Sequence, residues 1–115
     1  MGLSAFANTG LKSVYMSLSA GSTYSQIKAY AFAGCKQLTS VTNVGRNALA
    51  SYEFANCTAL REVTMPNVHD FINQGAFYGC TSLERLSFPP NTYGVSKDLA
   101  KGCTSLTSIE FQEPS

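Results

Sequence analysis

The sequence contains little of what marks a membrane-spanning or nucleic-acid-binding protein. It has no run of about 18 apolar residues, which excludes a transmembrane helix. Charged residues make up 13% of its 115 residues, about half of the usual share for globular domains. Eight basic and seven acidic side chains leave a net charge of +1, too little to attract nucleic acid or an anionic membrane. We therefore expect that the protein neither binds nucleic acid nor inserts into a membrane.

Residues that commonly carry catalysis are also scarce. There is no tryptophan and a single histidine, His69, which adjoins Asp70 but has no third group to complete a triad. No G-x-S-x-G elbow and no glycine-rich phosphate loop ending in GK[ST] occurs. Cysteine pairs about two to four residues apart, which zinc sites and redox motifs need, are absent. We predict a non-enzymatic protein without cofactor or metal, in which His69 is a solvated loop residue.

The four cysteines fall at regular intervals instead. They stand at positions 35, 57, 80 and 103, in steps of 22, 23 and 23 residues. An aromatic residue three positions before cysteine, a leucine three positions after it and an aliphatic residue three further on recur at the same steps, with Ala100 the exception at the aromatic position. The aligned segments read AFAGCKQLTSV, EFANCTALREV, AFYGCTSLERL and LAKGCTSLTSI. Such spacing indicates one structural position that is visited once per repeat.

A degenerate copy of the repeat opens the chain. It has Phe6 at the aromatic position, Thr9 where cysteine would stand, and then Leu11 and Val14. The longer stretch that follows, residues 16–26, contains Ala-Gly-Ser-Thr and is typical of a loop insertion. The 115 residues therefore divide into about five units of 22–23 residues.

Each unit ends in a segment with the periodicity of a β-strand. Apolar residues alternate there with polar ones, as at Val63 and Met65, so that one side of the strand is apolar. Pro66 and Pro89 close two of the strands, because proline donates no hydrogen bond to a ladder. A unit this short cannot bury its own apolar side, so the units are expected to stack strand on strand at about 4.8 Å. We predict that the A-F-x-x-C segment forms a short helical or 3₁₀ turn on the opposite side, with the phenylalanines stacked in a row.

These residues resemble a known family. The pattern of an aliphatic residue, Phe, Cys, Leu and a short apolar strand resembles the BspA-like (Treponema pallidum type) leucine-rich repeats over about residues 4–113. It departs from that pattern at Thr9, Asn43 and Ala100 and in the insertion. The resemblance implies a surface-exposed or secreted protein that adheres to extracellular-matrix proteins or cells, with no catalytic residues to carry over. The expected fold is an α/β repeat: a leucine-rich-repeat solenoid of about five coils, with a parallel sheet on one face and short helical turns on the other.

The cysteine row allows two readings. Cysteines at the same register of adjacent units could lie within about 4.4–6.8 Å between Cα atoms, close enough for a disulfide. Their side chains would run parallel rather than converge, and a free cysteine is itself a small residue that is often buried. We predict that Cys35, Cys57, Cys80 and Cys103 are structural free thiols.

The outward side of the strands is the surface with the clearest potential for binding. If the apolar residues point inward, the alternate positions point outward and stack in two rows. We name this set the sheet face; its candidate binding residues are Tyr15, Ser40, Thr42, Glu62, Thr64, Arg85, Ser87, Ser108 and Glu110. Glu62 beside Arg85 is expected to form a cross-strand ion pair worth ~0.5 kcal/mol, and Tyr15 and Tyr93 are expected to be exposed aromatic anchors. A mostly neutral, hydroxyl-rich strip is equally compatible with plain solvent.

The sequence therefore favours a non-catalytic module that binds a protein ligand through the sheet face, at the cell surface or outside the cell. The alternative is a structural spacer that positions another domain in a longer chain. We expect residues 1–115 to form one repeat domain, either a short member or a piece of a longer repeat protein. Because both ends show core residues without an obvious polar cap, association of copies through the ends is also expected.

Overall fold

A computed structural model of the chain describes residues 5–17, 29–44, 50–65, 71–72, 74–88, 94–95 and 98–111. Several predictions made from the sequence fall elsewhere. The predicted loop histidine His69, the predicted anchor Tyr93, the strand-ending prolines Pro66 and Pro89 and most of the insertion lie outside the described residues.

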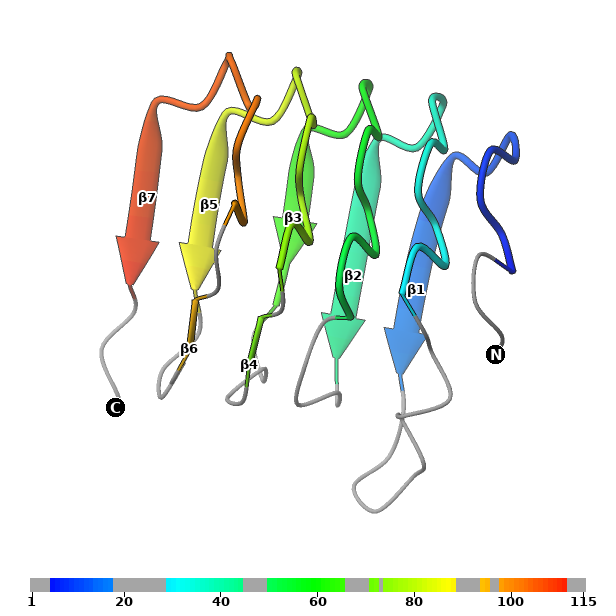
Figure 1. Cartoon of the computed structure of the whole chain (residues 1–115), viewed down its shortest axis with the longest axis horizontal. Coiled ribbons are helices and arrows are strands. Elements are labelled where there is room, and N and C mark those ends of the chain that lie inside the picture. The colour runs from blue at the N-terminus through cyan, green and yellow to red at the C-terminus, as the bar shows by residue number, and fades with distance from the viewer. Residues whose placement is uncertain are drawn as a thin grey trace.

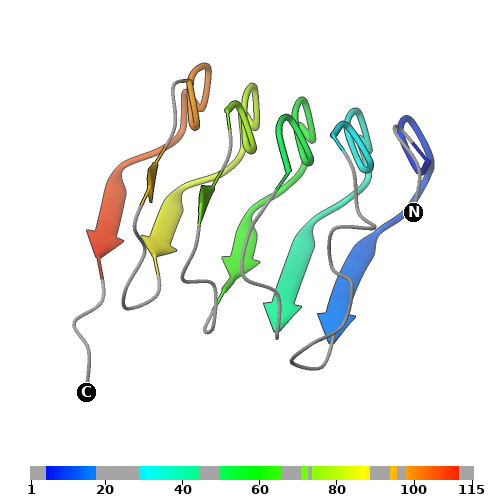
Figure 2. The same cartoon turned by 60° about the horizontal axis from the view of Figure 1, so that its bottom comes forward.

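Parallel strands form one side of the molecule, in the order of the repeats. They are β1 (Ser13–Ser17), β2 (Ser40–Val44), β3 (Glu62–Thr64), β5 (Arg85–Phe88) and β7 (Ser108–Phe111). β1 pairs with β2 and β2 with β3 in one parallel sheet, β5 pairs with β7 in another, and β3 contacts β5. Both views show these strands side by side in a row, with the turns following one another along one edge (Figures 1 and 2). The predicted parallel sheet is confirmed.

The register of the strands also agrees with the repeat spacing. Ser13 lies opposite Ser40 and Ser40 opposite Glu62, while Arg85 lies opposite Ser108. Each step joins residues that lie two positions after the recurring leucine position of successive repeats, such as Leu11 and Leu38. Register is strongly specified here because a shift by one residue would turn the buried side chains outward.

A second pair of short strands lies on the segments that lead from β3 and from β5 to the next turns. β4 (Phe71–Ile72) pairs with β6 (Gly94–Val95) in parallel, with Ile72 opposite Val95. These two residues belong to the aliphatic position that recurs five residues before the aromatic one. The two return segments that contain β4 and β6 are therefore joined by backbone pairing as well as by sequence, a pairing that the repeat pattern did not predict.

The described turns contain no helix, so the predicted short helical or 3₁₀ turns are not confirmed. Their amides bond to the following repeat instead of continuing a helix. The Phe32 and Gly34 amides donate to the Glu53 and Ala55 carbonyls at 2.9 and 2.7 Å, and other repeats show the same two bonds. Hydrogen bonds between residues i and i+3, such as that from the Cys57 amide to the Phe54 carbonyl, close the turns of the second to fifth repeats.

Left-handed backbone conformations give the turns their shape. The residue immediately before the cysteine position has a positive φ in every repeat, and glycine or asparagine occupies it each time. At Gly79, with φ of 73°, an added Cβ would collide with the Asn56 side chain of the preceding repeat. Gly34 stands in the same relation to Asn8. These positions therefore require a residue that tolerates both the conformation and the close approach.

Two rows of apolar side chains run through the core. The rings of Phe6, Phe32, Phe54 and Phe77 stack with centroid separations of 5.5, 5.3 and 6.0 Å, which confirms the predicted phenylalanine row. The leucines after cysteine are fully buried on the strand side at Leu38, Leu60 and Leu83. Burying one such side chain stabilises the fold by about 1.5–3 kcal/mol. Both rows depend on contacts between repeats, because equivalent residues of successive repeats lie against one another.

Candidate functional site

The sheet face has the arrangement predicted from strand alternation. Its residues lie on β1, β2, β3, β5 and β7, between positions whose side chains point to the core, such as Val41 and Leu86. One row runs through Ser40 and Glu62, and the other through Tyr15, Thr42 and Thr64. Across β5 and β7 the rows continue as Arg85 opposite Ser108 and Ser87 opposite Glu110. The structure thus brings the predicted residues onto one surface.

Exposure differs along this surface. Tyr15 is 70% exposed, which agrees with its predicted role as an exposed aromatic residue. Glu62, Thr64, Arg85 and Glu110 are also exposed, whereas Ser40, Thr42, Ser87 and Ser108 are half-buried. The tyrosine and the charged side chains of the sheet face are therefore more exposed to solvent than most of its hydroxyl groups.

The ion pair predicted between Glu62 and Arg85 is not formed. The Arg85 Nε lies 3.3 Å from the Glu110 Oε1, one diagonal step across the β5–β7 pair. Diagonal neighbours on one face of a sheet are within reach of a long side chain. Both groups are exposed, so the pair contributes little to stability, about 0.5 kcal/mol.

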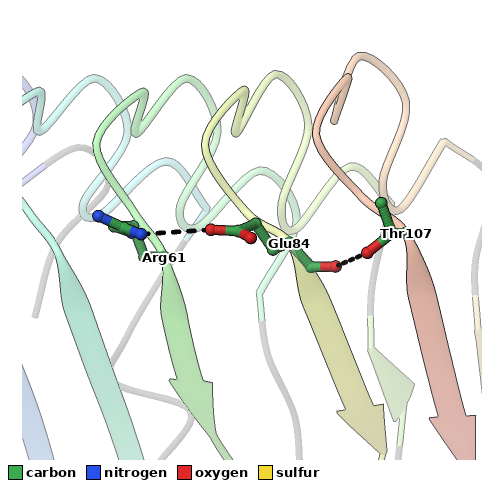
Figure 3. A network of polar contacts seen from close by, with 3 residues as sticks. All are labelled: Arg61, Glu84 and Thr107. Carbon is green, nitrogen blue, oxygen red and sulfur yellow. Dashed lines mark hydrogen bonds and ion pairs between the residues drawn. The ribbon is translucent and has the colours of Figure 1, made fainter.

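The sequence patterns did not predict a row of polar residues that lies immediately before the strands. Arg61 Nη2 lies 3.3 Å from Glu84 Oε2, and the Thr107 hydroxyl donates to the Glu84 carbonyl at 3.3 Å (Figure 3). The Thr39 hydroxyl donates in the same way to the Lys12 carbonyl. Every one of these residues precedes a strand by one position, and this recurring polar position was the signal in the sequence.

This polar row borders a hollow on the sheet face. The hollow has a volume of about 610 Å³ and is lined by Thr39, Ser40, Arg61, Glu62 and Glu84. Its lining carries one guanidinium and two carboxylates beside hydroxyl groups, and none of these side chains is fully buried. The hollow can therefore offer both donors and acceptors of hydrogen bonds to a partner, while it lacks an enclosed apolar floor.

The cysteine row is structural. All four cysteines are free thiols, as predicted. Each thiol donates to the carbonyl of the aromatic-position residue one repeat earlier, at 3.1–3.3 Å: Cys35 to Phe6, Cys57 to Phe32, Cys80 to Phe54 and Cys103 to Phe77. In the first repeat Thr9 occupies the cysteine position, and its hydroxyl donates to the Phe6 carbonyl of the same repeat at 2.9 Å.

Burial suppresses ionisation of the Cys57, Cys80 and Cys103 thiols. Desolvation raises the pKa of Cys57 to about 12 and also raises the pKa values of Cys80 and Cys103. The thiolate, which is the nucleophile and the metal ligand, is therefore disfavoured at neutral pH. Within the described ranges no group of three or more His, Cys, Asp or Glu residues is placed to hold a metal ion.

The sequence patterns also did not predict a cluster of tyrosines on the turn side. The rings of Tyr30 and Tyr52 stack with centroids 5.1 Å apart, and Tyr78 meets Tyr52 edge-on at 6.1 Å. The three rings border a hollow of about 400 Å³ that also contacts Asp98 and Lys101. Tyr30 and Tyr52 share one repeat position, but Tyr78 comes from another, so the repeat pattern alone gave an incomplete signal.

Glu53 is a buried charged residue within the turn row. It occupies the position held by Ala31 and Ala76 in neighbouring repeats, and it is fully buried. Its Oε1 accepts a hydrogen bond from the Ala50 amide at 2.8 Å. The carboxylate thereby closes its own turn, and it lies away from the sheet face.

Comparison with known proteins identifies the family. A family model described as a BspA type leucine-rich repeat region (6 copies) matches residues 1–115. The described strands show five repeats on the sheet side, one fewer than that description counts. No curated protein and no solved structure matches the chain.

Leucine-rich repeats generally mediate protein interactions and are generally non-enzymatic. Across the residues that the structure describes, no helix has the length and apolar character needed to cross a membrane. The match over the whole sequence agrees with the phenylalanine, cysteine and leucine rows and with the parallel strands in repeat register. The chain belongs to the BspA-type leucine-rich repeat family.

Proposed function

We propose that the sheet face binds another protein and that the chain is an adhesion module of a surface or secreted protein. In this proposal residues 1–115 form one continuous solenoid domain, whose stacked strands hold the binding side chains rigidly. The observation that carries the proposal is the gathering of exposed Tyr15, Glu62, Thr64, Arg85 and Glu110 on one surface.

The chemistry of this surface supports a protein partner. Tyrosine and arginine are enriched among residues that contribute most to protein–protein binding, and both occur here in exposed positions. Arg61, Glu62 and Glu84 border a polar hollow beside them. Charges of both signs next to hydroxyl groups favour a partner whose own surface is mixed rather than uniformly acidic or basic.

The experiment is a binding assay of the 115-residue chain against a panel of purified extracellular-matrix proteins. For any that binds, we expect Thr64→Arg and Arg85→Glu each to weaken binding by tenfold or more. The matched control is Lys101→Glu, an exposed charge reversal on the turn side, which should leave affinity unchanged. Thermal unfolding of each variant shows whether the fold is intact.

Two outcomes would contradict the proposal. Unchanged affinity in both sheet-face variants would move the binding site elsewhere on the molecule. Absence of binding across the panel, together with a functional domain found beside this one in a longer chain, would favour the spacer role.

A further inference from the structure

The three tyrosines of the turn side form a cluster that runs along the row of repeats. Tyr30 and Tyr52 stack with centroids 5.1 Å apart and an angle of 6° between the rings, and Tyr78 meets Tyr52 edge-on at 6.1 Å. The three residues come from three successive repeats. Tyr30 is 42% exposed, and Tyr52 and Tyr78 are half-buried. None of them belongs to the sheet face, so the proposed function leaves this cluster unused.

The backbone that carries two of these rings has an uncommon conformation. Tyr30 and Tyr52 have φ of 60° and 54°, in the left-handed region that bulky residues rarely adopt. The same position of the next repeat is Gly75, where an added Cβ would collide with the Tyr52 ring. Glycine adopts this conformation without steric cost, so the turn itself does not require a tyrosine there. Uncommon backbone conformations of large residues are concentrated at functional sites, which points to a role for the two rings.

The cluster lines a hollow that crosses four repeats. The hollow has a volume of about 400 Å³, and its lining extends from Tyr30 in the second repeat to Asp98 in the fifth. A second hollow of about 440 Å³ shares Tyr30, Ala33 and Asn56 with the first and continues toward the first repeat. The two hollows therefore adjoin along the row of repeats, and we name them together the turn groove.

The turn groove offers neutral hydrogen-bonding groups beside small apolar ones. The tyrosine hydroxyls and the Asn56 amide can each donate and accept hydrogen bonds, and Ala33 and Ala55 supply methyl groups. Asp98 and Lys101, which also border the cluster, bear one charge of each sign. An uncharged ligand with many hydroxyl groups and apolar C–H surfaces matches this lining better than a strongly acidic or basic one.

The spacing along the turn groove distinguishes two kinds of extended ligand. Stacked repeats follow one another at about 4.8 Å on the strand side. On the turn side the Tyr30 and Tyr52 centroids are 5.1 Å apart. An extended β-linked oligosaccharide advances by a similar distance for each sugar ring. An extended peptide presents side chains to one side only about every 6.7 Å, so it falls out of step with the repeats.

We propose that the turn groove binds a neutral, extended oligosaccharide, with about one sugar ring for each repeat and the tyrosine cluster at the centre of the site. The proposal goes beyond the binding of a protein through the sheet face. The two sites lie on different sides of the molecule, and their ligands differ in chemistry.

Isothermal titration calorimetry of the 115-residue chain with chitohexaose and cellohexaose, two neutral β-linked hexasaccharides, tests the proposal. We expect binding of at least one of them, about tenfold or more tighter than binding of its disaccharide, because the longer ligand contacts several repeats. Tyr30→Ala and Tyr78→Ala should each weaken binding by about tenfold. The matched control is Tyr15→Ala, which removes an exposed tyrosine from the sheet face and should leave oligosaccharide binding unchanged. Because Tyr30 is exposed, its variant keeps the test valid if thermal unfolding shows that Tyr78→Ala is not folded.

Four results would overturn the proposal. They are absence of binding to both hexasaccharides, equal affinity for a hexasaccharide and its disaccharide, unchanged affinity in both tyrosine variants, and tighter binding of a sulfated heparin hexasaccharide at the same tyrosines. A protein partner whose binding is lost in Tyr30→Ala, without any oligosaccharide binding, would assign the turn groove to a protein instead. Failure of matrix-protein binding with oligosaccharide binding retained would refute only the proposed function.

Discussion

Two neighbouring repeats have the same local structure and very different burial. Leu86 and Phe88 on β5 lie in register opposite Ile109 and Phe111 on β7. The β5 pair is 0% and 1% exposed, whereas the β7 pair is 51% and 65% exposed. Residue type and backbone conformation are alike in the two repeats, so the difference comes from the repeat that follows. In this fold the apolar side chains of a strand are buried by the repeat that follows them.

The cysteines on the turn side show the same difference in burial between neighbouring repeats. Cys80 and Cys103 both donate to a phenylalanine carbonyl of the preceding repeat, at 3.2 and 3.1 Å. Cys80 is fully buried, whereas Cys103 is half-buried. Contacts with the preceding repeat are therefore kept at the end of the row, and the contribution of the following repeat is lost. Substitutions at equivalent positions should show how much that contribution is worth.

The largest difference is expected in the phenylalanine row. Phe54 is stacked on both sides and fully buried, so Phe54→Ala should lower the free energy of unfolding by about 3–5 kcal/mol. Phe6 is stacked on one side and partly exposed, so Phe6→Ala should cost about 1 kcal/mol. Urea unfolding of the two variants measures both values. Equal losses would show that a single neighbour is enough to bury a ring.

The next difference is expected at the glycine before cysteine. Gly79→Ala forces an alanine into φ of 73° and drives its Cβ into the Asn56 side chain, so the expected loss is about 2 kcal/mol. Gly102 has φ of 84°, but its added Cβ would approach only the Gly79 backbone, at 3.4 Å or more, and a loss of about 1 kcal/mol is expected. Denaturant midpoints of the two variants separate the conformational cost from the steric one. A larger loss at Gly102 would contradict this account.

The third difference concerns the thiols. The pKa of Cys57 is raised from 9.0 to about 12, so the unfolded chain loses this proton first as the pH rises. Its contribution to stability is complete below pH 9.0 and is lost between pH 9.0 and about 12. Between about pH 8 and pH 10 the unmodified chain should therefore lose about 1.4 kcal/mol more than Cys57→Ala does.

Cys103→Ala provides the comparison at the end of the row. The pKa of Cys103 is also raised by burial, but its thiol is half-buried, so its substitution should change the pH dependence less. Chemical labelling of the folded chain should likewise modify Cys103 before Cys80. Parallel pH profiles for the unmodified chain and Cys57→Ala would refute the assignment of this proton.

The smallest effects are expected for the two exposed ion pairs. Arg61–Glu84 lies in the middle of the row and Arg85–Glu110 at its end, both with N–O distances of 3.3 Å. Because water screens both, double-mutant cycles should give about 0.5 kcal/mol for each pair, decreasing with added salt. Position in the row should not matter here. A pair energy several times larger in the middle would show that neighbours affect exposed charges as well as buried rings.

The register of this fold could be predicted because every contact in it repeats. Once the cysteine, phenylalanine and leucine positions were aligned, the pairing of Ser40 with Glu62 and of Arg85 with Ser108 followed directly. The sheet face also followed, because side chains of a strand alternate between its two sides. These features depend only on the spacing of residues along the chain, which can be read directly from the sequence.

Features that depend on backbone or side-chain geometry could not be predicted. Tyr30 and Tyr52 have positive φ, which is uncommon for bulky residues, so no local preference pointed to a non-helical turn there. Glycine or asparagine before each cysteine is a signal in the sequence for a left-handed residue at that position. The partner of Arg85 depends on side-chain reach, since the directly opposite and the diagonal positions both lie within range.

The hydrogen bonds of the thiols have a consequence for how the length of such a chain can change. Each joins residues 25 to 29 positions apart, so every repeat recognises its neighbour through an interval of about one repeat. Removing or duplicating a whole unit of 22 or 23 residues keeps these partners in register. The Cys35–Phe6 bond also forms across the longer interval of 29 residues, so extra residues between a strand and the next turn are accommodated. The number of repeats is therefore free to vary by gene duplication, and the spacing between the turn and its strand is the more constrained length.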